Sequence, residues 1–183
     1  MATTRRQLER PARRRKGGAQ LDGGRGLDQW ATIYQTYNAI FKVAELALLA
    51  QRLSLPQLHL LSVLKKGGGL LTTGEIGEAM VKASQTITGL VDRLEEPGFV
   101  ERVFDRKDRR KTWVRMTKEG ERKLAEAVPV FNRLVDELFS VLTDQDLQDL
   151  QAKLEKLRSA TMDRLTAALA RQQVRVFADL RQF

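Results

Sequence analysis

The sequence predicts a mainly α fold with a small β-hairpin. Apolar residues recur at three- and four-residue steps from Leu27 onward, which is the period of an amphipathic helix. Two short runs near 99–104 and 112–116 are rich in β-branched and aromatic residues and flank a charged segment, as the strands of a hairpin do. Glycine and proline divide the helical pattern into six helices.

Composition excludes several classes of site. The 183 residues suit one domain, or one domain with an appended helical module. The absence of cysteine excludes disulfides, cysteine-ligated zinc and thiol chemistry, and the single His59 excludes a histidine cluster. No apolar run reaches the roughly 18 residues of a membrane span, and the N-terminus lacks the apolar core of a signal peptide. We therefore expect a bacterial cytoplasmic protein without a cofactor.

The net charge of +9 is concentrated in two places. Residues 1–26 hold eight basic and two acidic side chains and are rich in glycine, so we expect a disordered basic arm. Residues 102–123 hold ten basic and four acidic side chains, whereas the rest of the chain holds 14 basic and 17 acidic. Two basic regions on a mildly acidic body indicate an anionic polymer as partner. A solubilising tail beside an ordinary charged hairpin is the plainer alternative.

The first two helices are expected to flank residue 53. The apolar face of the first is long and aromatic, and comprises Leu27, Trp30, Ile33, Tyr34, Tyr37, Ile40, Phe41, Ala44 and Leu48. In the second, Ser54 is a plausible N-cap, Pro56 lies in the first turn and the glycines at 67–69 end the helix. Its buried face is expected to contain Leu58, Leu61 and Leu64.

Two shorter helices and the hairpin follow. Thr72 and Glu75 fit a capping box for a helix that ends near Met80. A fourth helix is expected over 83–96, with a buried face made of Ile87, Leu90, Val91 and Leu94. The strands near 99–104 and 112–116 then enclose a charged loop at 105–111.

The apolar pattern predicts two long helices in the last part of the chain. Thr117 can cap a fifth helix that runs to about Val141, and Pro129 predicts a kink in it. Thr143, with Asp146 three residues later, starts a sixth helix. Its apolar side comprises Leu147, Leu150, Leu154, Leu157, Met162 and Leu165. Residues 173–183 form a C-terminal tail whose structure the pattern leaves unassigned.

This order of elements is typical of a winged helix-turn-helix, in which the N-terminal side chains of one helix enter the DNA major groove. In the fourth helix those side chains are short and polar: Ser84, Gln85, Thr86 and Thr88, with Arg93 further along. Gln85 can bond adenine bidentately, and threonine methyls can touch a thymine methyl. Such residues also simply cap and solvate helices. The basic hairpin directly downstream favours DNA binding.

The hairpin loop carries Arg106, Lys107, Arg109, Arg110 and Lys111 within six positions. A narrow, A·T-rich minor groove concentrates negative potential and attracts arginine. Asp108 lies two residues before Arg110 and could hold its guanidinium in a salt bridge. A solvated loop with partly offsetting charges is the alternative, but the excess of cations argues against it.

From about Leu27 to Ala168 the sequence resembles the MarR family of bacterial transcription regulators. Three segments carry the resemblance, and they are residues 71–78, 86–95 and 105–120. The resemblance implies that the second segment is the recognition helix, that Arg110 enters the minor groove and that Asp108 orients it. Lys82 departs from the usual apolar residue, and Met116 from the usual leucine.

The resemblance also implies a two-fold dimer built from the first and the last two helices. We therefore divide the chain into a winged helix-turn-helix domain over 53–119 and a helical dimerisation domain over 27–52 and 120–172. The wide apolar faces of the first and sixth helices agree with this, since one winged domain could not cover both. Folding back onto their own core is the alternative. A dimer would space its recognition helices about 34 Å apart on a pseudo-palindromic operator.

MarR relatives often release DNA when a small aromatic or phenolic anion binds. The candidate effector pocket is lined by Trp30, Tyr34, Tyr37, Phe41 and His59, because aromatic rings offer stacking and hydroxyl or ring nitrogen groups offer polar contacts. The same residues lie at core spacing and could simply pack. Without cysteine, the chain cannot sense peroxide through a thiol.

We therefore expect a sequence-specific DNA-binding regulator that acts as a homodimeric, ligand-responsive repressor. The alternative is a nucleoid or RNA-binding structural protein that uses the same basic surfaces without sequence preference. An enzyme is not expected. The sequence has no acid and base paired around His59, no glycine-rich phosphate loop followed by lysine, and no metal-ligand spacing.

Overall fold

The computed structural model describes residues 26–104 and 112–179. The chain divides into two compact units, Met1–Ile40 and Phe41–Phe183. Helix α1 (Leu27–Leu48) belongs to both, and a 3-10 turn at Leu49–Gln51 follows it. Toward its C-terminal end, Ala44 and Leu48 are buried, as the sequence predicts. Trp30, Tyr34 and Tyr37 are all more than half exposed, so their part of the predicted apolar face is open.

Helix α2 (Leu55–Lys66) begins and ends as its sequence predicts. The Ser54 hydroxyl accepts a hydrogen bond from the Gln57 N–H, and the Gln57 side chain accepts one from the Ser54 N–H. These bonds satisfy backbone donors that have no partner within the helix. At the other end Gly68 and Gly69 have φ of 80° and 85°, a region that side chains disfavour. The chain can therefore reverse directly after Lys66.

The sheet has three strands, one more than the sequence predicts. The additional strand is β1 (Leu70–Thr72), and it pairs antiparallel with β3 (Thr112–Met116). Strand β2 (Val100–Phe104) pairs with the other side of β3, so the spatial order is β1-β3-β2. In register, Leu70 lies opposite Arg115, and Val100 lies opposite Met116. The predicted loop at 105–111 lies outside the described residues.

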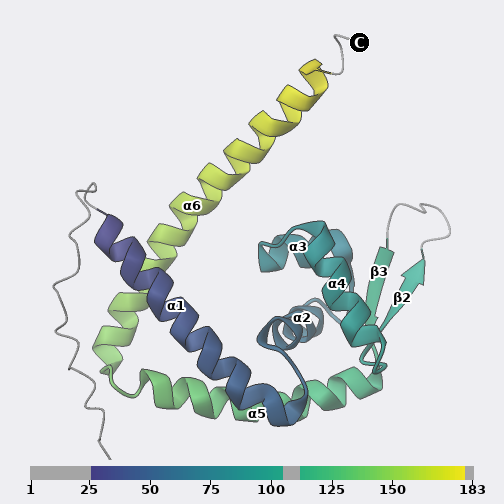
Figure 1. Cartoon of the computed structure of the whole chain (residues 1–183), viewed down its shortest axis with the longest axis horizontal. Helices are drawn as coiled ribbons and strands as arrows, with labels where there is room; N and C mark the ends of the chain where they lie inside the picture. The colour runs from purple at the N-terminus through teal and green to yellow at the C-terminus, as the bar shows by residue number, and fades with distance from the viewer. Residues whose placement is uncertain (1–25, 105–111, 180–183) are drawn as a thin grey trace, which may run out of the picture. The chain divides into compact units, whose positions relative to one another are not determined.

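Helices α3 (Thr73–Met80) and α4 (Ser84–Glu95) lie between β1 and β2 in the sequence. Their inward residues are Ile76, Met80, Ile87, Leu90, Val91 and Leu94, all buried. They join a core cluster that also contains Leu58, Leu60, Leu61 and Leu64 of α2 and Val100 and Val114 of the sheet. Helix α4 lies beside β2, one strand of the hairpin in Figure 1.

Helix α5 (Lys118–Phe139) starts at the predicted cap, where the Thr117 hydroxyl accepts a hydrogen bond from the Gly120 N–H at 3.0 Å. The helix continues through Pro129, where the sequence predicts a kink. Its first turns contribute Leu124 and Ala127 to the buried core, with Val128 and Phe131 packed against it.

Helix α6 (Asp144–Asp179) is 36 residues long and begins beside Thr143, as predicted. The Asp146 carboxylate accepts hydrogen bonds from the Thr143 N–H and hydroxyl. The helix continues past residue 172 into the segment that the sequence leaves unassigned. Within the part of α6 whose side chains are described, no residue is buried. The predicted apolar side is therefore uncovered in the single chain.

Candidate nucleic-acid interface

Helices α3 and α4 are joined by a tight turn. Val81 ends α3 in the left-handed region, with φ of 52°. The Val81 N–H donates to the Glu78 carbonyl oxygen, and the Lys82 N–H donates to that of Gly77 at 2.9 Å. A Cβ on Gly77 would lie 3.1 Å from the Lys82 carbonyl oxygen, so the absence of a side chain there lets the turn close. These contacts fix where α4 starts.

Helix α4 has one buried and one exposed face. Four apolar side chains at 87, 90, 91 and 94 anchor it in the core. All five residues that the sequence assigns to DNA contact from this helix are exposed: Ser84, Gln85, Thr86, Thr88 and Arg93. Arg93 follows Thr86 by seven residues, which places both on one side of the helix. The structure thus brings these five predicted residues onto one helix surface.

The N-terminal end of α4 is suited to an anion. Ala83 occupies the N-cap position and offers no side-chain acceptor, so the first-turn N–H groups have no side-chain cap. The helix dipole adds positive potential at this end. The exposed Lys82 lies just before it. Backbone donors and a cation next to exposed polar side chains match the needs of a nucleic acid backbone.

A second positive feature lies near this turn. His59 is exposed on α2, but partial desolvation of its imidazole, followed by the charges of Lys66 and Lys82, lowers its pKa below the usual value. His59 and Lys66 belong to α2, and Lys82 belongs to the α3–α4 turn, so cations from two segments act on the imidazole. Desolvation and the two neighbouring positive charges both favour the neutral imidazole.

Strands β2 and β3 support the hairpin that the sequence assigns to the wing. Five of the predicted contact residues, Arg106, Lys107, Asp108, Arg109 and Arg110, lie outside the described residues. The described base of the hairpin includes Arg102 on β2, which pairs with Asp92 and Glu95 of α4. The sequence places Arg102 in a basic region and indicates no further role for it. No local pattern marks this pairing, because it depends on how β2 packs against α4.

Comparison with known proteins agrees with this arrangement. Residues 53–111, which include α2 to β2, match the sequence model of the MarR family. The chain belongs to the MarR family. The HTH-type transcriptional repressor MdtR of Bacillus subtilis is 32% identical over 104 residues, or 57% of this chain and 66% of MdtR. The match spans about three fifths of other curated relatives.

Solved structures of MarR-like regulators share the fold. The organohalide-sensing regulator RdhR in its 2,4-dichlorophenol-bound form has a TM-score of 0.69 at 19% identity, covering 78% of this chain and 89% of RdhR. A MarR variant from Escherichia coli complexed with operator DNA has a TM-score of 0.67 at 20% identity, covering 72% of this chain and 94% of MarR. At these identities the likeness establishes the fold.

The residues expected to form a MarR-type effector pocket are placed as follows. The Trp30 and Tyr34 rings stack on the exposed surface of α1, with centroids 6.1 Å apart and planes 25° apart. Tyr37 is also exposed, whereas Phe41 is half-buried and His59 lies exposed on α2. The structure therefore shows the Trp30–Tyr34 stack, while a pocket formed by all five expected effector residues stays a prediction.

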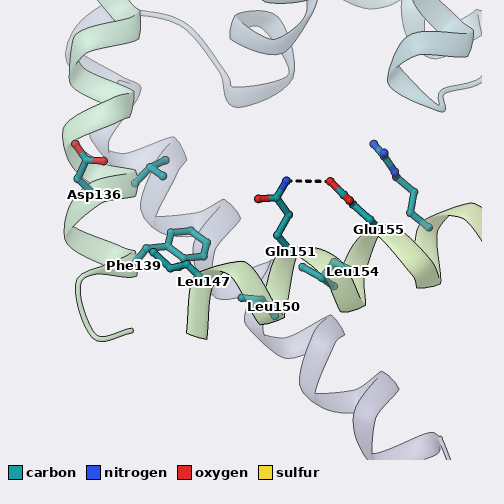
Figure 2. Close-up of a pocket in the computed structure, with 9 residues that line it drawn as sticks. Asp136, Phe139, Leu147, Leu150, Gln151, Leu154 and Glu155 are labelled. Carbon is teal, nitrogen blue, oxygen red and sulfur yellow. Dashed lines mark hydrogen bonds between the residues drawn. The ribbon is translucent and has the colours of Figure 1, made fainter. Parts of the chain in front are cut away.

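Sequence reasoning did not predict an apolar groove between α5 and α6 (Figure 2). It has a volume of about 520 Å³, and its apolar lining comprises Val135, Phe139, Leu147, Leu150 and Leu154. Gln151 and Glu155 bond to each other at 2.9 Å on α6. None of the five expected effector residues lines this groove.

No group of three or more histidine or acidic residues suited to a metal ion occurs among the described residues. Within residues 26–104 and 112–179, no helix is long and apolar enough to cross a membrane.

Proposed function

We propose that this chain is a sequence-specific DNA-binding transcription regulator that acts as a homodimer. The observation that carries the proposal is the exposed polar row at the start of α4. The opposite face of the helix is held in the core, so the row projects from a fixed support. Placing such a row in the major groove is how helix-turn-helix proteins read sequence.

Each part of the surface would have a distinct task. The Gln85 amide offers a donor and an acceptor that match the N7 and N6 groups of adenine, and the Thr86 and Thr88 methyls suit thymine. Lys82 and the first N–H groups of α4 would bind phosphate, which adds affinity without sequence preference. We propose that Arg110, oriented by Asp108, enters the minor groove.

We further propose that the protein dimerises through residues 27–52 and 120–172, with residues 53–119 binding DNA. The support is apolar surface that the chain leaves uncovered. Leu154, Leu157 and Leu169 of α6 are about half exposed, and Leu154 also lines the groove of Figure 2. Soluble proteins seldom expose large apolar patches unless a partner covers them. Two copies would place two recognition helices on a pseudo-palindromic site.

Regulation by a small ligand and repression complete the proposal. RdhR is described in a 2,4-dichlorophenol-bound form and MdtR is named a repressor, and both support a repressor that responds to an aromatic or phenolic anion. The stacked pair of Trp30 and Tyr34, with Tyr37, Phe41 and His59, is where we propose that such an effector binds. Aromatic side chains supply the stacking area that this ligand class needs.

Selection from a random duplex library tests the proposal. We expect the full-length protein to enrich a short inverted repeat and to prefer it over a shuffled duplex by at least 1,000-fold at fixed salt. Recovery of no common sequence, with equal affinity for both duplexes, would instead favour a non-specific nucleoid protein.

A matched pair of glutamine variants assigns the preference to α4. Gln85→Ala is expected to lower the affinity for the selected duplex about tenfold, because it removes one bidentate base contact. Gln148→Ala, at an exposed glutamine of α6 that does not line the groove of Figure 2, should leave it unchanged. Equal behaviour of the two variants in a fluorescence anisotropy titration would contradict the role of α4.

A further inference from the structure

Arg102 forms a clamp between the recognition helix and the sheet. Its Nη2 lies 2.5 Å from the Asp92 Oδ1, and its Nη1 pairs with the Glu95 Oε2. Nη2 also donates to the Thr88 carbonyl oxygen at 3.4 Å. The backbone N–H of Arg102 donates to the second Glu95 oxygen at 2.9 Å. One strand residue therefore bonds to three residues of α4.

The three partners form one row on α4. Thr88, Asp92 and Glu95 are spaced by four and three residues, so they follow one side of the helix. This row starts at Thr88, whose side chain belongs to the exposed polar row proposed to read bases. The clamp therefore contacts the residues proposed to read bases directly, through the backbone carbonyl of Thr88.

Among the ion pairs of the described residues, the clamp alone joins α4 to the sheet. Its arginine is also less exposed than that of the pair within the sheet. The Arg102 side chain is 19% exposed, whereas in Arg115–Glu101, which joins β3 to β2, both partners are about half exposed. Hydrogen bonds with Asp92 and the charges of Glu95 and Asp92 outweigh the effect of partial burial and raise the pKa of Arg102. Its guanidinium is thus a permanent cation with donors in a fixed plane.

Stability alone does not require this arrangement. Four buried apolar side chains already anchor α4. Apolar contacts are non-directional, so they tolerate small rotations and shifts of a helix along its axis. Charge-assisted hydrogen bonds from a planar guanidinium restrict those movements. The clamp therefore supplies orientation more than binding energy for the fold.

We propose that Arg102 is a positioning residue for sequence reading, which fixes α4 against the hairpin so that base contacts keep their geometry. The inference rests on the proposed DNA-binding function. Loss of the clamp would let α4 shift, which weakens directional contacts to base edges more than it weakens contacts to phosphate. The signature is a lower ratio of affinities for the selected and the shuffled duplex, rather than a uniform loss of binding.

Three variants test this with the full-length protein and both duplexes at one salt concentration. Arg102→Gln removes the clamp but leaves Asp92 and Glu95 unpaired. Arg102→Gln combined with Asp92→Asn removes the clamp at the wild-type net charge. Arg115→Gln, in the exposed pair of the same sheet, is the matched control.

We expect the affinity ratio to fall about tenfold in Arg102→Gln and in the charge-matched double variant, and to stay unchanged in Arg115→Gln. An unchanged ratio in Arg102→Gln would overturn the inference. Full recovery in the double variant would overturn it too, since charge alone would then account for the effect.

A substitute variant and the result for the wild-type protein keep the test decisive. If Arg102→Gln does not fold by circular dichroism, Arg102→Lys replaces it, because lysine keeps the charge but cannot hold two carboxylates and a carbonyl group together. That variant should lower the ratio several-fold, and an unchanged ratio would count against the clamp. If the wild-type protein selects no duplex, the proposed function itself fails, which is a separate result from loss of the Arg102 effect.

Discussion

At Gly120 the first turn of α5 passes directly against the chain that enters β2. A Cβ on this residue would lie 2.0 Å from the Phe99 carbonyl oxygen, a backbone atom that cannot turn aside. The same Gly120 N–H donates to the Thr117 hydroxyl, so the cap and the close approach share one residue. The start of α5 thus depends on the absence of a side chain.

Gly120→Ala should therefore destabilise the fold by about 3 kcal/mol, measured by urea unfolding, since overpacking against backbone is costly. Gly89→Ala is the matched control. It lies inside α4, and a Cβ there would meet nothing within 4 Å. Alanine should stabilise that helix by about 0.5–1 kcal/mol. Similar effects at both positions would contradict the steric explanation.

His59 makes stability depend on pH near neutrality. Its pKa is lowered in the folded chain by partial desolvation and by Lys66 and Lys82, so the unfolded chain binds a proton first as the pH falls. The free energy of unfolding should therefore decrease as the pH falls from 7.5 through about 6.5, the ordinary imidazole pKa. His59 is the sole histidine in the sequence.

His59→Gln should remove this decrease, measured by urea unfolding at pH 7.5, 6.5 and 6.0. The two proteins differ only at residue 59, so the difference between the two pH profiles isolates the imidazole. An identical slope in the variant would show that another group is responsible.

At the level of elements, helix α3 is held at its start by two reciprocal hydrogen bonds. The Thr72 hydroxyl accepts from the Glu75 N–H at 3.2 Å, and the Thr72 N–H donates to the Glu75 carboxylate at 2.7 Å. Thr72 is also the last residue of β1, opposite Trp113. The cap thus joins the sheet to the first helix of the helix-turn-helix.

Thr72→Ala should cost about 1 kcal/mol of stability, because an N-cap acceptor is lost. Thr32→Ala is the control. The Thr32 hydroxyl only donates to the Asp28 carbonyl oxygen within α1, so its loss should change stability little. Chemical unfolding of both variants gives the comparison. Equal losses would mean that the cap is not the cause.

Elements with local signals could be predicted from the sequence. The caps at Ser54, Thr72 and Thr117 and the glycines after Lys66 each act over three or four residues, so spacing alone revealed them. Strand β1 could not be predicted in this way. It has three residues, and its pairing of Leu70 with Arg115 joins positions far apart in the chain.

In the candidate site, too, local features could be predicted from the sequence, whereas contacts between distant segments could not. The exposed row at 84–88 follows from helical periodicity once the buried face of α4 is known. The Arg102 clamp depends on how β2 packs against α4, which no local pattern contains. Aromatic residues such as Trp30 mark an apolar helix face, but periodicity does not say whether that face meets the chain's own core or another chain.

For the whole molecule, helix α6 sets the expected oligomeric state. Leu157 is 52% exposed on a helix that buries no side chain among its described residues. If a second copy covers this surface, Leu157→Gln should shift the protein toward monomer in sedimentation equilibrium, because it removes apolar area from the interface.

Lys156→Gln is the matched control, since Lys156 is the exposed neighbour of Leu157 and lies on a more polar side of α6. It should leave the association constant unchanged. A wild-type protein that sediments as a monomer, or a Leu157→Gln variant with wild-type association, would contradict dimerisation through α6.

The central position of β3 has a consequence for how the domain opens. Strand β3 is paired on both sides, and its partner β1 precedes α3, α4 and β2 in the chain. Helix α4 therefore lies inside a closed loop of backbone whose two ends are joined in one sheet. Amide protons of β3 should exchange with solvent through opening of the whole domain rather than through local fraying. Separating α4 from the domain would then require cooperative unfolding, so we expect this helix to open only together with the rest of the domain.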